Sequence, residues 1–341
     1  MIRPIDLVRS PRRTLAYIQR EARWLHHFAR TMEHRGIHAL PPATSEPTDR
    51  LHAALDATDI AEIAARLCGE DAEKWAAAPP QDRKRLALAF GLHYGVPGVA
   101  EKTGLSALDP PETVHAMGRG SVATGGSYYY ADIVADALLG AGAGLSGGRA
   151  LDFGCSSGRV VRVLAAAFPE IEWHGCDPQP RPIAWARENL PGIEFIVSPE
   201  SPPLPHRDGF FDVVFAISIW SHYGQHAARI WLEEMHRLVR PGGHLLLTFH
   251  GLTSIAYYVA HDGRTRRESV KLAGDLYRDG FWFAQPWDTA EGDHGIRNPE
   301  WGTAFLTTEW LLNEVVPRWT VVGYGPGGAE GNQDVVVLRR R

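Results

Sequence analysis

Three histidines stand where a proton acceptor could act in this sequence. His222 and His250 each follow an apolar run that has the length and composition of a buried strand. His294 lies in a long segment, roughly 251–305, that is expected to cover the ends of the same strands. Neutral imidazole accepts a proton near pH 7, so histidine commonly acts as the general base toward a hydroxyl or ammonium group. We predict that one of the three has this role.

A glycine-containing loop, in the stretch LDFGCSSGRVVR (151–162), supplies a second chemical feature. Gly154 and Gly158 let the backbone turn tightly, and the helix expected after them presents free N–H groups to a ligand. Asp177 ends the next apolar run, where its carboxylate suits ribose hydroxyls. Ser156 occupies the position of a middle glycine. This pattern predicts a site for a nucleotide-like cofactor.

Strand and helix patterns alternate from about residue 121 onward. The strand patterns are 149–154, 171–177, 193–197, 211–220, 244–250, 318–325 and 332–340. The helical patterns between them are 158–169, 180–189 and 226–240. Such alternation predicts an α/β fold in which helices cover both faces of a mostly parallel sheet, and the last two strands are close enough to form an antiparallel hairpin. The carboxyl ends of the parallel strands then share one edge, where ligands bind.

The first 120 residues are predicted to be helices separated by proline-rich breaks. Their helical patterns are 15–29, 51–69 and 79–95, with Thr48 or Asp49 as a cap for the second and Pro80 near the start of the third. We expect this region to shape a substrate pocket, to act as a lid, or to make the contact of a homodimer.

Composition narrows the class of protein. The net charge of −5 argues against a nucleic-acid partner, which requires clustered positive charge. No long apolar run follows the basic N-terminus, so neither a secretory signal nor membrane insertion is expected. The three cysteines form no paired motif, which favours a reduced, cytoplasmic setting.

Four landmarks in order resemble the class I S-adenosylmethionine-dependent methyltransferases over roughly 121–341. They are the loop stretch with its acidic–apolar–G-x-S-x-G spacing, FFDVVFAISIWSHY with Asp212 near its start, EEMHRLVRPGGHLLLT with Gly242 and Gly243, and the closing hairpin. The resemblance implies a Rossmann-like, seven-stranded sheet. A nicotinamide-dependent oxidoreductase is the alternative from another class, although its third glycine is missing here. A non-catalytic methyltransferase-like subunit is a further alternative.

The resemblance also implies the cofactor S-adenosylmethionine and the residues around it. The loop would line its methionine part, Asp177 would hold the ribose, Glu200 would border the adenine, and Tyr129 or Tyr130 would close over it. Asp152 is expected to accept from backbone amides nearby. The predicted cofactor-binding set is Asp152, Gly154, Cys155, Ser156, Gly158, Asp177, Pro178, Glu200, Ser218 and Tyr129.

The residues after the fourth strand bear on the methyl acceptor. Ser218-Ile219-Trp220-Ser221 stands where nucleic-acid and protein amine methyltransferases often carry an Asn-Pro-Pro-aromatic motif, and no acidic metal ligands occur there. We therefore predict metal-free O-methylation of a small molecule, with N- or C-methylation as the alternative. Aromatic residues in and near the long insertion suit a glycan, a sugar-bearing compound or a planar natural product, or else form a small satellite core: Tyr257, Tyr258, Tyr277, Phe281, Trp282, Phe283, Trp287 and Trp301.

Overall fold

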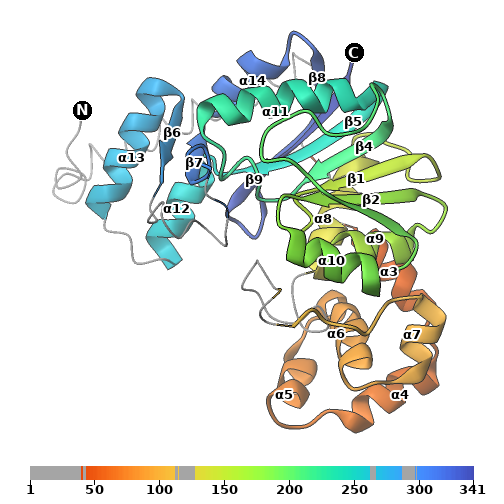
Figure 1. Ribbon diagram of the computed structural model, residues 1–341. Helices are drawn as coiled ribbons and strands as arrows, with labels where there is room; N and C mark the ends of the chain where they lie inside the picture. Colours follow the sequence, from red (N-terminus) through yellow and green to blue (C-terminus); the bar gives the residue numbers. More distant parts are fainter. Residues whose placement is uncertain are drawn as a thin grey trace, which may run out of the picture. The chain divides into compact units, whose positions relative to one another are not determined.

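The computed structural model has a seven-stranded sheet at its centre (Figure 1). Its strands are β1 Arg149–Phe153, β2 Glu172–Asp177, β3 Ile193–Val197, β4 Phe211–Ala216, β5 Val239–Phe249, β8 Trp319–Ala329 and β9 Gln333–Arg340. They lie in the order β3-β2-β1-β4-β5-β9-β8, parallel as far as β5, with β9 antiparallel to β5 and β8. The predicted Rossmann-like fold and its terminal hairpin are confirmed. The strand order reverses between β1 and β4, which is where an open α/β sheet places its ligand.

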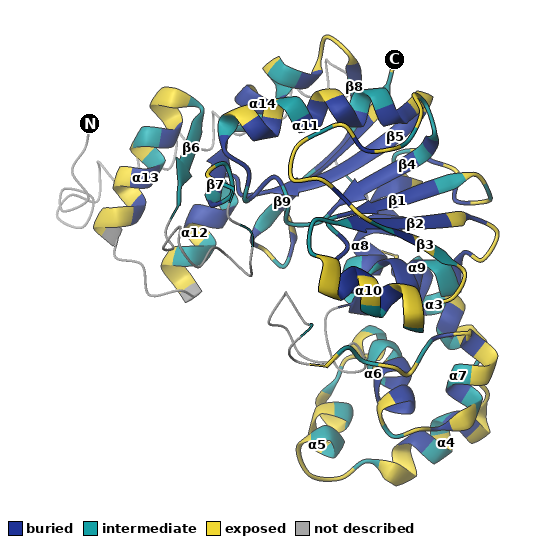
Figure 2. Cartoon of the chain, in the orientation of Figure 1, coloured by how far each residue is buried: buried dark blue, intermediate teal, exposed yellow. Residues whose placement is uncertain are grey.

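Helices cover both faces of this sheet (Figure 1). The helices on one face are α8 Ser127–Gly140, α9 Val161–Ala167 and α10 Pro180–Asn189, and those on the other are α11 Gln225–Leu238 and α14 Thr308–Val315. The central strands are buried along most of their length (Figure 2), as their nearly continuous apolar sequences require. The sheet is therefore a rigid platform for the loops at its carboxyl edge.

The structure describes residues 40, 44–111, 114, 127–261, 266–285, 296 and 298–341. Leu40–Arg341 form one compact unit, so the helices before the sheet belong to the same unit as the sheet. The predicted helix over 15–29, the predicted domain boundary at 120/121, Trp287 and His294 lie outside the described residues. Among the described residues, no helix has both the length and the apolar character needed to cross a membrane.

Five short helices precede the sheet: α3 Glu46–Ala53, α4 Ala57–Arg66, α5 Gly69–Ala77, α6 Pro80–His93 and α7 Pro97–Thr103. The single helical pattern predicted over 51–69 is wrong, because one helix ends at Ala53 and another begins at Ala57. The Asp56 side chain accepts hydrogen bonds from the N–H groups of Thr58 and Asp59, and the Asp59 side chain accepts from Asp56 N–H. This reciprocal cap starts a new helix at that point. Pro80 opens α6, as predicted.

The start of α3 is capped by another helix. Thr48 and Asp49 were the predicted caps, but both lie inside α3, which begins after Ser45. The Asp136 carboxylate on α8 accepts from the N–H groups of Ser45 (2.6 Å) and Glu46 (3.1 Å). One turn earlier on α8, Asp132 accepts from both Thr48 N–H (3.0 Å) and Thr48 Oγ1 (2.8 Å). Two buried aspartates thus satisfy the first-turn donors of α3 and fix it to the sheet domain.

Several further predicted boundaries differ from the structure. The strand predicted over 211–220 ends at Ala216. The helix predicted over 226–240 ends at Leu238, and β5 begins at Val239 instead of the predicted 244, with a shift in its pairing register with β4 between Phe211 and Val213. β8 continues to Ala329, beyond the predicted 318–325, with two register irregularities on the way. Glycine-rich sequence therefore marks bends within these two strands, not their ends.

The insertion after β5 forms a small unit of helices and strands. It contains α12 Leu252–His261, α13 Arg266–Asp279 and the antiparallel strands β6 Phe281–Ala284 and β7 Thr303–Leu306. Ile255, Leu272, Leu276 and Phe305 are buried together, with Tyr258 and Trp282 packed against them. Part of the aromatic content therefore builds a satellite core, one of the two predicted roles for these residues.

The α8 caps give a stability prediction. Asp136→Ala leaves the N–H groups of Ser45 and Glu46 without an acceptor, which is expected to lower the free energy of unfolding by about 2 kcal/mol. Urea unfolding followed by circular dichroism measures this. Glu188→Ala, an exposed change on α10, is the control and is expected to stay near wild type. Equal stabilities of the two variants would contradict the capping role.

Candidate active site

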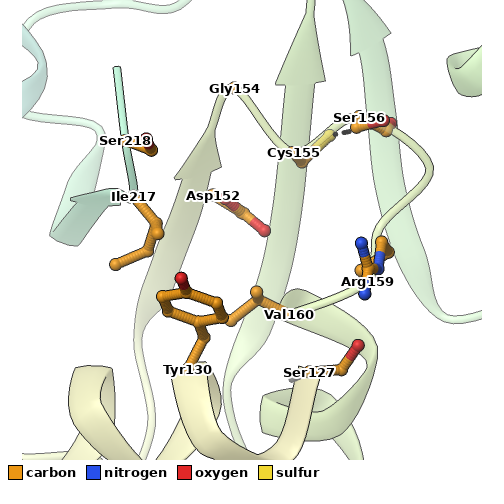
Figure 3. Close-up of a pocket in the computed structure, with 10 residues that line it drawn as sticks. All are labelled: Ser127, Tyr130, Asp152, Gly154, Cys155, Ser156, Arg159, Val160, Ile217 and Ser218. Atoms are coloured by element: carbon orange, nitrogen blue, oxygen red, sulfur yellow. Dashed lines mark hydrogen bonds between the residues drawn. The ribbon is translucent and has the colours of Figure 1, made fainter. Parts of the chain in front are cut away.

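A pocket lies at the carboxyl ends of β1 and β4 (Figure 3). It is lined by Ser127, Tyr130, Asp152, Gly154, Cys155, Ser156, Arg159, Val160, Ile217 and Ser218. Ser218 and Ile217 stand on the side of the pocket away from Ser156 and Arg159 in Figure 3. The pocket therefore has two sides, one from the loop after β1 and one from the segment after β4.

The loop after β1 is held in a left-handed conformation. Gly154 has φ 85°, Ser156 has φ 49° and Gly158 has φ 78°. A Cβ on Gly158 would come within 2.8 Å of Leu190 Cδ1, so this glycine also permits close packing against α10. Ser156 N–H donates to Asp177 Oδ2 (3.0 Å), which holds the serine in a conformation that costs a side-chain-bearing residue free energy. The hydrogen bond to Asp177, at the end of β2, thus holds the loop in this conformation.

Two buried hydroxyls in the pocket lack a partner among the described residues. Ser127 is 1% exposed and Ser156 is 5% exposed, and neither Oγ has a hydrogen-bond partner among the described residues. Buried hydroxyls are normally satisfied. These two orphaned groups, both lining the pocket, are therefore suited to a polar ligand.

Two carboxylates lie close to the loop in a poorly solvated setting. Burial raises the pKa of Asp152 to about 8; the neighbouring Asp177 adds to this rise, and the hydrogen bond from Val161 N–H opposes it. Burial also raises the pKa of Asp177, against the hydrogen bonds donated by Gln179 N–H and Ser156 N–H. Asp152 lines the pocket and Asp177 is tied to the loop, so a cationic ligand would relieve the cost of their charge.

His222 is fixed by the insertion. Its Nδ1 lies 2.7 Å from the carbonyl oxygen of Gly302, which can only accept, so Nδ1 carries a proton. The ring stacks on Trp301, with centroids 4.8 Å apart and planes inclined by 21°. In the neutral ring, the lone pair is therefore on Nε2. The structure gives His222 the tautomer and the fixed orientation that a general base needs.

His250 has a different environment. The side chain is 4% exposed, and Nδ1 donates to Ala304 O at 3.2 Å. Its Nε2 accepts from the Tyr258 hydroxyl (3.1 Å) and faces the Gln333 amide nitrogen at 3.4 Å. Because two donors face the one lone pair of Nε2, His250 is placed to orient its neighbours.

The remaining predicted residues are distributed around the site. Gly154, Cys155 and Ser218 line the pocket with Asp152 and Ser156. Glu200 has an exposed side chain and is not among the lining residues; its carbonyl accepts from Asn298 Nδ2 at 3.4 Å. Pro178 is half-buried between β2 and α10.

The three consecutive tyrosines on α8, residues 128–130, have different surroundings. Tyr129, the predicted cofactor residue, turns its hydroxyl to the β8–β9 turn, where it accepts from Glu330 N–H at 3.0 Å. Tyr130, the alternative, lines the pocket, and Tyr128 is buried in the core. Adjacent helical residues point in different directions, so the run cannot serve one site.

Sequence reasoning missed Ser127 and Arg159 in the pocket and Gln333 beside it. Arg159 directly follows Gly158 in the turn before α9, and its place next to the glycine loop was a readable signal. Ser127 lies one turn before Tyr130 on α8 and so faces the same way. Gln333 had no local signal, because its place depends on how β9 pairs with β5.

Comparison with known proteins locates the family signal in the same region. Residues 150–243 match the family model of the methyltransferase domain. The chain is 37% identical over 106 residues to the phthiotriol/phenolphthiotriol dimycocerosates methyltransferase 1 of Mycobacterium ulcerans, covering 30% of this chain and 38% of that protein. It is 33% identical over 101 residues to the trans-aconitate 2-methyltransferase of Methylobacterium nodulans, covering 28% and 35%. The matches thus span well under half the length of these relatives.

A crystal structure of an S-adenosylmethionine-dependent methyltransferase from Methanosarcina mazei aligns with a TM-score of 0.42 at 19% identity, covering 57% of this chain and 93% of that one. The strand order and the loop after β1 define a Rossmann-like domain with a pocket at the point where the strand order reverses. The similarity to methyltransferase domains lies over residues 150–243, which include the loop after β1.

Ser156 tests the strain in the loop. Ser156→Gly removes a left-handed serine and its unpartnered hydroxyl, so it is expected to raise the free energy of unfolding by about 1 kcal/mol. Thermal unfolding of the ligand-free protein measures this. Ser156→Leu is expected to lower stability, because a larger side chain enters the same strained and buried position. A glycine variant less stable than wild type would contradict the strain.

Asp152 predicts a pH dependence of stability. Its pKa is about 8 when folded and about 4 when unfolded, so the folded state holds the proton more tightly. The stability that it contributes is complete below pH 4 and is lost as the pH rises through 8. Asp152→Asn removes this loss, so its advantage over wild type should grow between pH 5 and pH 8.5 in urea unfolding. A constant difference between the two proteins would show that Asp152 keeps an ordinary pKa.

Proposed function

We propose that the protein transfers a methyl group from S-adenosylmethionine to a hydroxyl group of a small molecule. The observation that carries the proposal is the pocket at the β1–β4 switch, where a left-handed glycine–serine loop and two unpartnered buried hydroxyls meet. It lies within the region that matches the methyltransferase domain. The two curated relatives named above are methyltransferases by name, which agrees with this assignment.

The residues of the pocket fit this cofactor. Ser156 Oγ and Ser127 Oγ can donate to the carboxylate of its methionine part, which satisfies both orphaned groups. Asp177 keeps lone pairs for ribose hydroxyls beyond its two backbone contacts. Burial favours the protonated form of Asp152, and a cationic ligand beside it would favour the ionised form. When bound, the cofactor supplies a methyl group on a positively charged sulfur.

The polar groups after β4 and β5 favour a neutral acceptor. The described segments 217–224 and 248–258 contain hydroxyl, imidazole and phenol groups and no lysine or arginine. Enzymes that bind a carboxylate generally provide a guanidinium or ammonium group for it. Arg159 also lines the pocket but stands on the side away from Ile217 and Ser218 (Figure 3). The segments after β4 and β5 therefore support a hydroxyl acceptor over a carboxylate acceptor.

His222 is the proposed base. An acceptor hydroxyl must lose its proton as the oxygen gains a methyl group, and Nε2 of the Nδ1-protonated ring can accept it. Gly302 and Trp301 hold the ring in place, so little reorganisation is needed. His250 then serves to order the site. Stacking surfaces such as Trp301 support a sugar-bearing or planar natural-product acceptor.

The base is tested with radiolabelled S-adenosylmethionine and a panel of phenols, sugars and natural-product hydroxyls. His222→Gln keeps an N–H group for Gly302 O but cannot accept the proton, so methyl transfer is expected to fall by about 10²–10⁴-fold. Affinity for S-adenosylhomocysteine should not change. His226→Ala, an exposed histidine on α11, is the matched control and should retain activity.

Two results would count against this function. Label appearing only on amine, carbon or protein acceptors would exclude the hydroxyl. Full activity of His222→Gln would exclude His222 as the base.

A further inference from the structure

We propose that Ser218 is a preset hydrogen-bond donor for the oxygen atom that accepts the methyl group. The proposal rests on the proposed function and makes its acceptor more specific; it replaces the cofactor-binding role that the sequence predicts for Ser218. Ser218 lines the pocket, on the side away from the glycine loop (Figure 3). Its polar partners all come from β5, β9 and the segment after β4, which also carry His222 and His250.

Ser218 is held in place at a cost. Its φ of 61° is left-handed, a conformation that side-chain-bearing residues rarely adopt. Its N–H donates to Thr248 Oγ1 at 2.7 Å, which fixes the backbone there. Strained backbone of this kind clusters at functional sites, where the surrounding structure maintains it.

Gln333 determines the direction of the first of two hydrogen bonds at Ser218 Oγ. Thr248 Oγ1 already accepts from Ser218 N–H and donates its own proton to Gln333 Oε1 at 2.6 Å. The Gln333 amide group is thereby oriented with its NH₂ toward Ser218, and Nε2 lies 2.7 Å from Ser218 Oγ. An amide nitrogen can only donate, so Ser218 Oγ must accept this bond.

Ser221 determines the direction of the second hydrogen bond at Ser218 Oγ. Its side chain is fully buried, and Ser218 Oγ, at 3.1 Å, is the one hydrogen-bond partner of Ser221 Oγ among the described residues. If Ser218 donated to Ser221, the Ser221 proton would be buried without an acceptor, which is costly. Ser221 therefore donates to Ser218.

Ser218 Oγ then accepts two hydrogen bonds and retains one proton. Both lone pairs are engaged on the side of Gln333 and Ser221, so the proton is directed to the pocket that Ser218 lines. An atom that receives it must have a lone pair to spare. A hydroxyl oxygen has two, one for Ser218 and one for the incoming methyl group. A neutral amine has one, and an ammonium group has none. Because Ser218 Oγ can only donate into the pocket, it favours an oxygen atom over a nitrogen atom as the methyl acceptor.

The test uses two cofactor analogues and needs no knowledge of the acceptor. S-adenosylhomocysteine has a neutral sulfur, whereas sinefungin carries an amine-bearing carbon in place of the sulfonium and presents a donor-only ammonium group. Calorimetry gives Kd for both analogues on wild type, Ser218→Ala and Gln333→Met. The quantity compared is the Kd of sinefungin divided by that of S-adenosylhomocysteine.

In wild type, the Ser218 hydroxyl can only donate into the pocket, and it therefore disfavours the ammonium group of sinefungin, which can also only donate. Ser218→Ala removes the opposition, and Gln333→Met frees Ser218 Oγ to accept from the ammonium group. The ratio should therefore fall from wild type to Ser218→Ala and further to Gln333→Met, about tenfold in total, while Kd for S-adenosylhomocysteine stays constant.

Other outcomes overturn the proposal. Equal ratios in the three proteins would show that the polarity is not fixed. Weaker S-adenosylhomocysteine binding by Ser218→Ala would make Ser218 a cofactor ligand. Failure of both analogues to bind wild type would instead overturn the proposed function itself.

A stability measurement separates backbone strain from the hydrogen bonds of the Ser218 hydroxyl. Glu330→Gly removes a left-handed, side-chain-bearing residue and should raise Tm. Ser218→Gly removes one as well, but it leaves the buried Ser221 proton without an acceptor, so its Tm should lie below that of Glu330→Gly. Glu330 lies on the β8–β9 turn and is not a pocket residue, so its variant should keep the wild-type ratio of the two Kd values. Ser218→Gly should show the ratio of Ser218→Ala. A wild-type ratio in Ser218→Gly would contradict the role of the hydroxyl.

Discussion

The antiparallel pairing of β9 with β5 organises the side of the pocket that carries Ser218. Thr248 is paired with Val335 and Phe249 with Asp334, so Gln333 falls beside His250 just past the end of this ladder. From there its amide contacts Ser218, Thr248 and His250 together. A shift of one residue would turn Gln333 to the other face of the sheet and leave these groups without their common partner. The position of one strand thus sets the hydrogen-bond pattern of the site.

The two sides of the pocket share a physical design. Ser156 and Ser218 both have positive φ, and each is held there by a hydrogen bond from its own N–H to a neighbouring strand end. Neither position uses glycine, although glycine would cost less free energy. The hydroxyl is what the serine adds at each position. The resulting loss of stability is compatible with function, because strained groups are commonly kept where a ligand compensates them.

Much of the fold could be predicted from sequence because it depends on local patterns. Alternating strands and helices, the glycine loop and Asp177 at the end of β2 are all readable in short windows. The break between α3 and α4 was missed, since the Asp56 cap interrupts a pattern that is otherwise continuous in helical propensity. The caps from Asp132 and Asp136 could not be predicted, because they join residues about 90 positions apart. The polarity of Ser218 depends in the same way on Gln333, 115 residues away. These contacts depend on how distant segments pack and on the register of strand pairing, which local sequence patterns do not specify.

The proposed function depends most directly on which cofactor the pocket holds. Calorimetric titration of the wild-type chain with S-adenosylhomocysteine, and separately with NAD, distinguishes a methyltransferase site from a dinucleotide site in the same fold. We expect saturable one-to-one binding of S-adenosylhomocysteine and no heat of binding for NAD. Binding of NAD without binding of S-adenosylhomocysteine would contradict it.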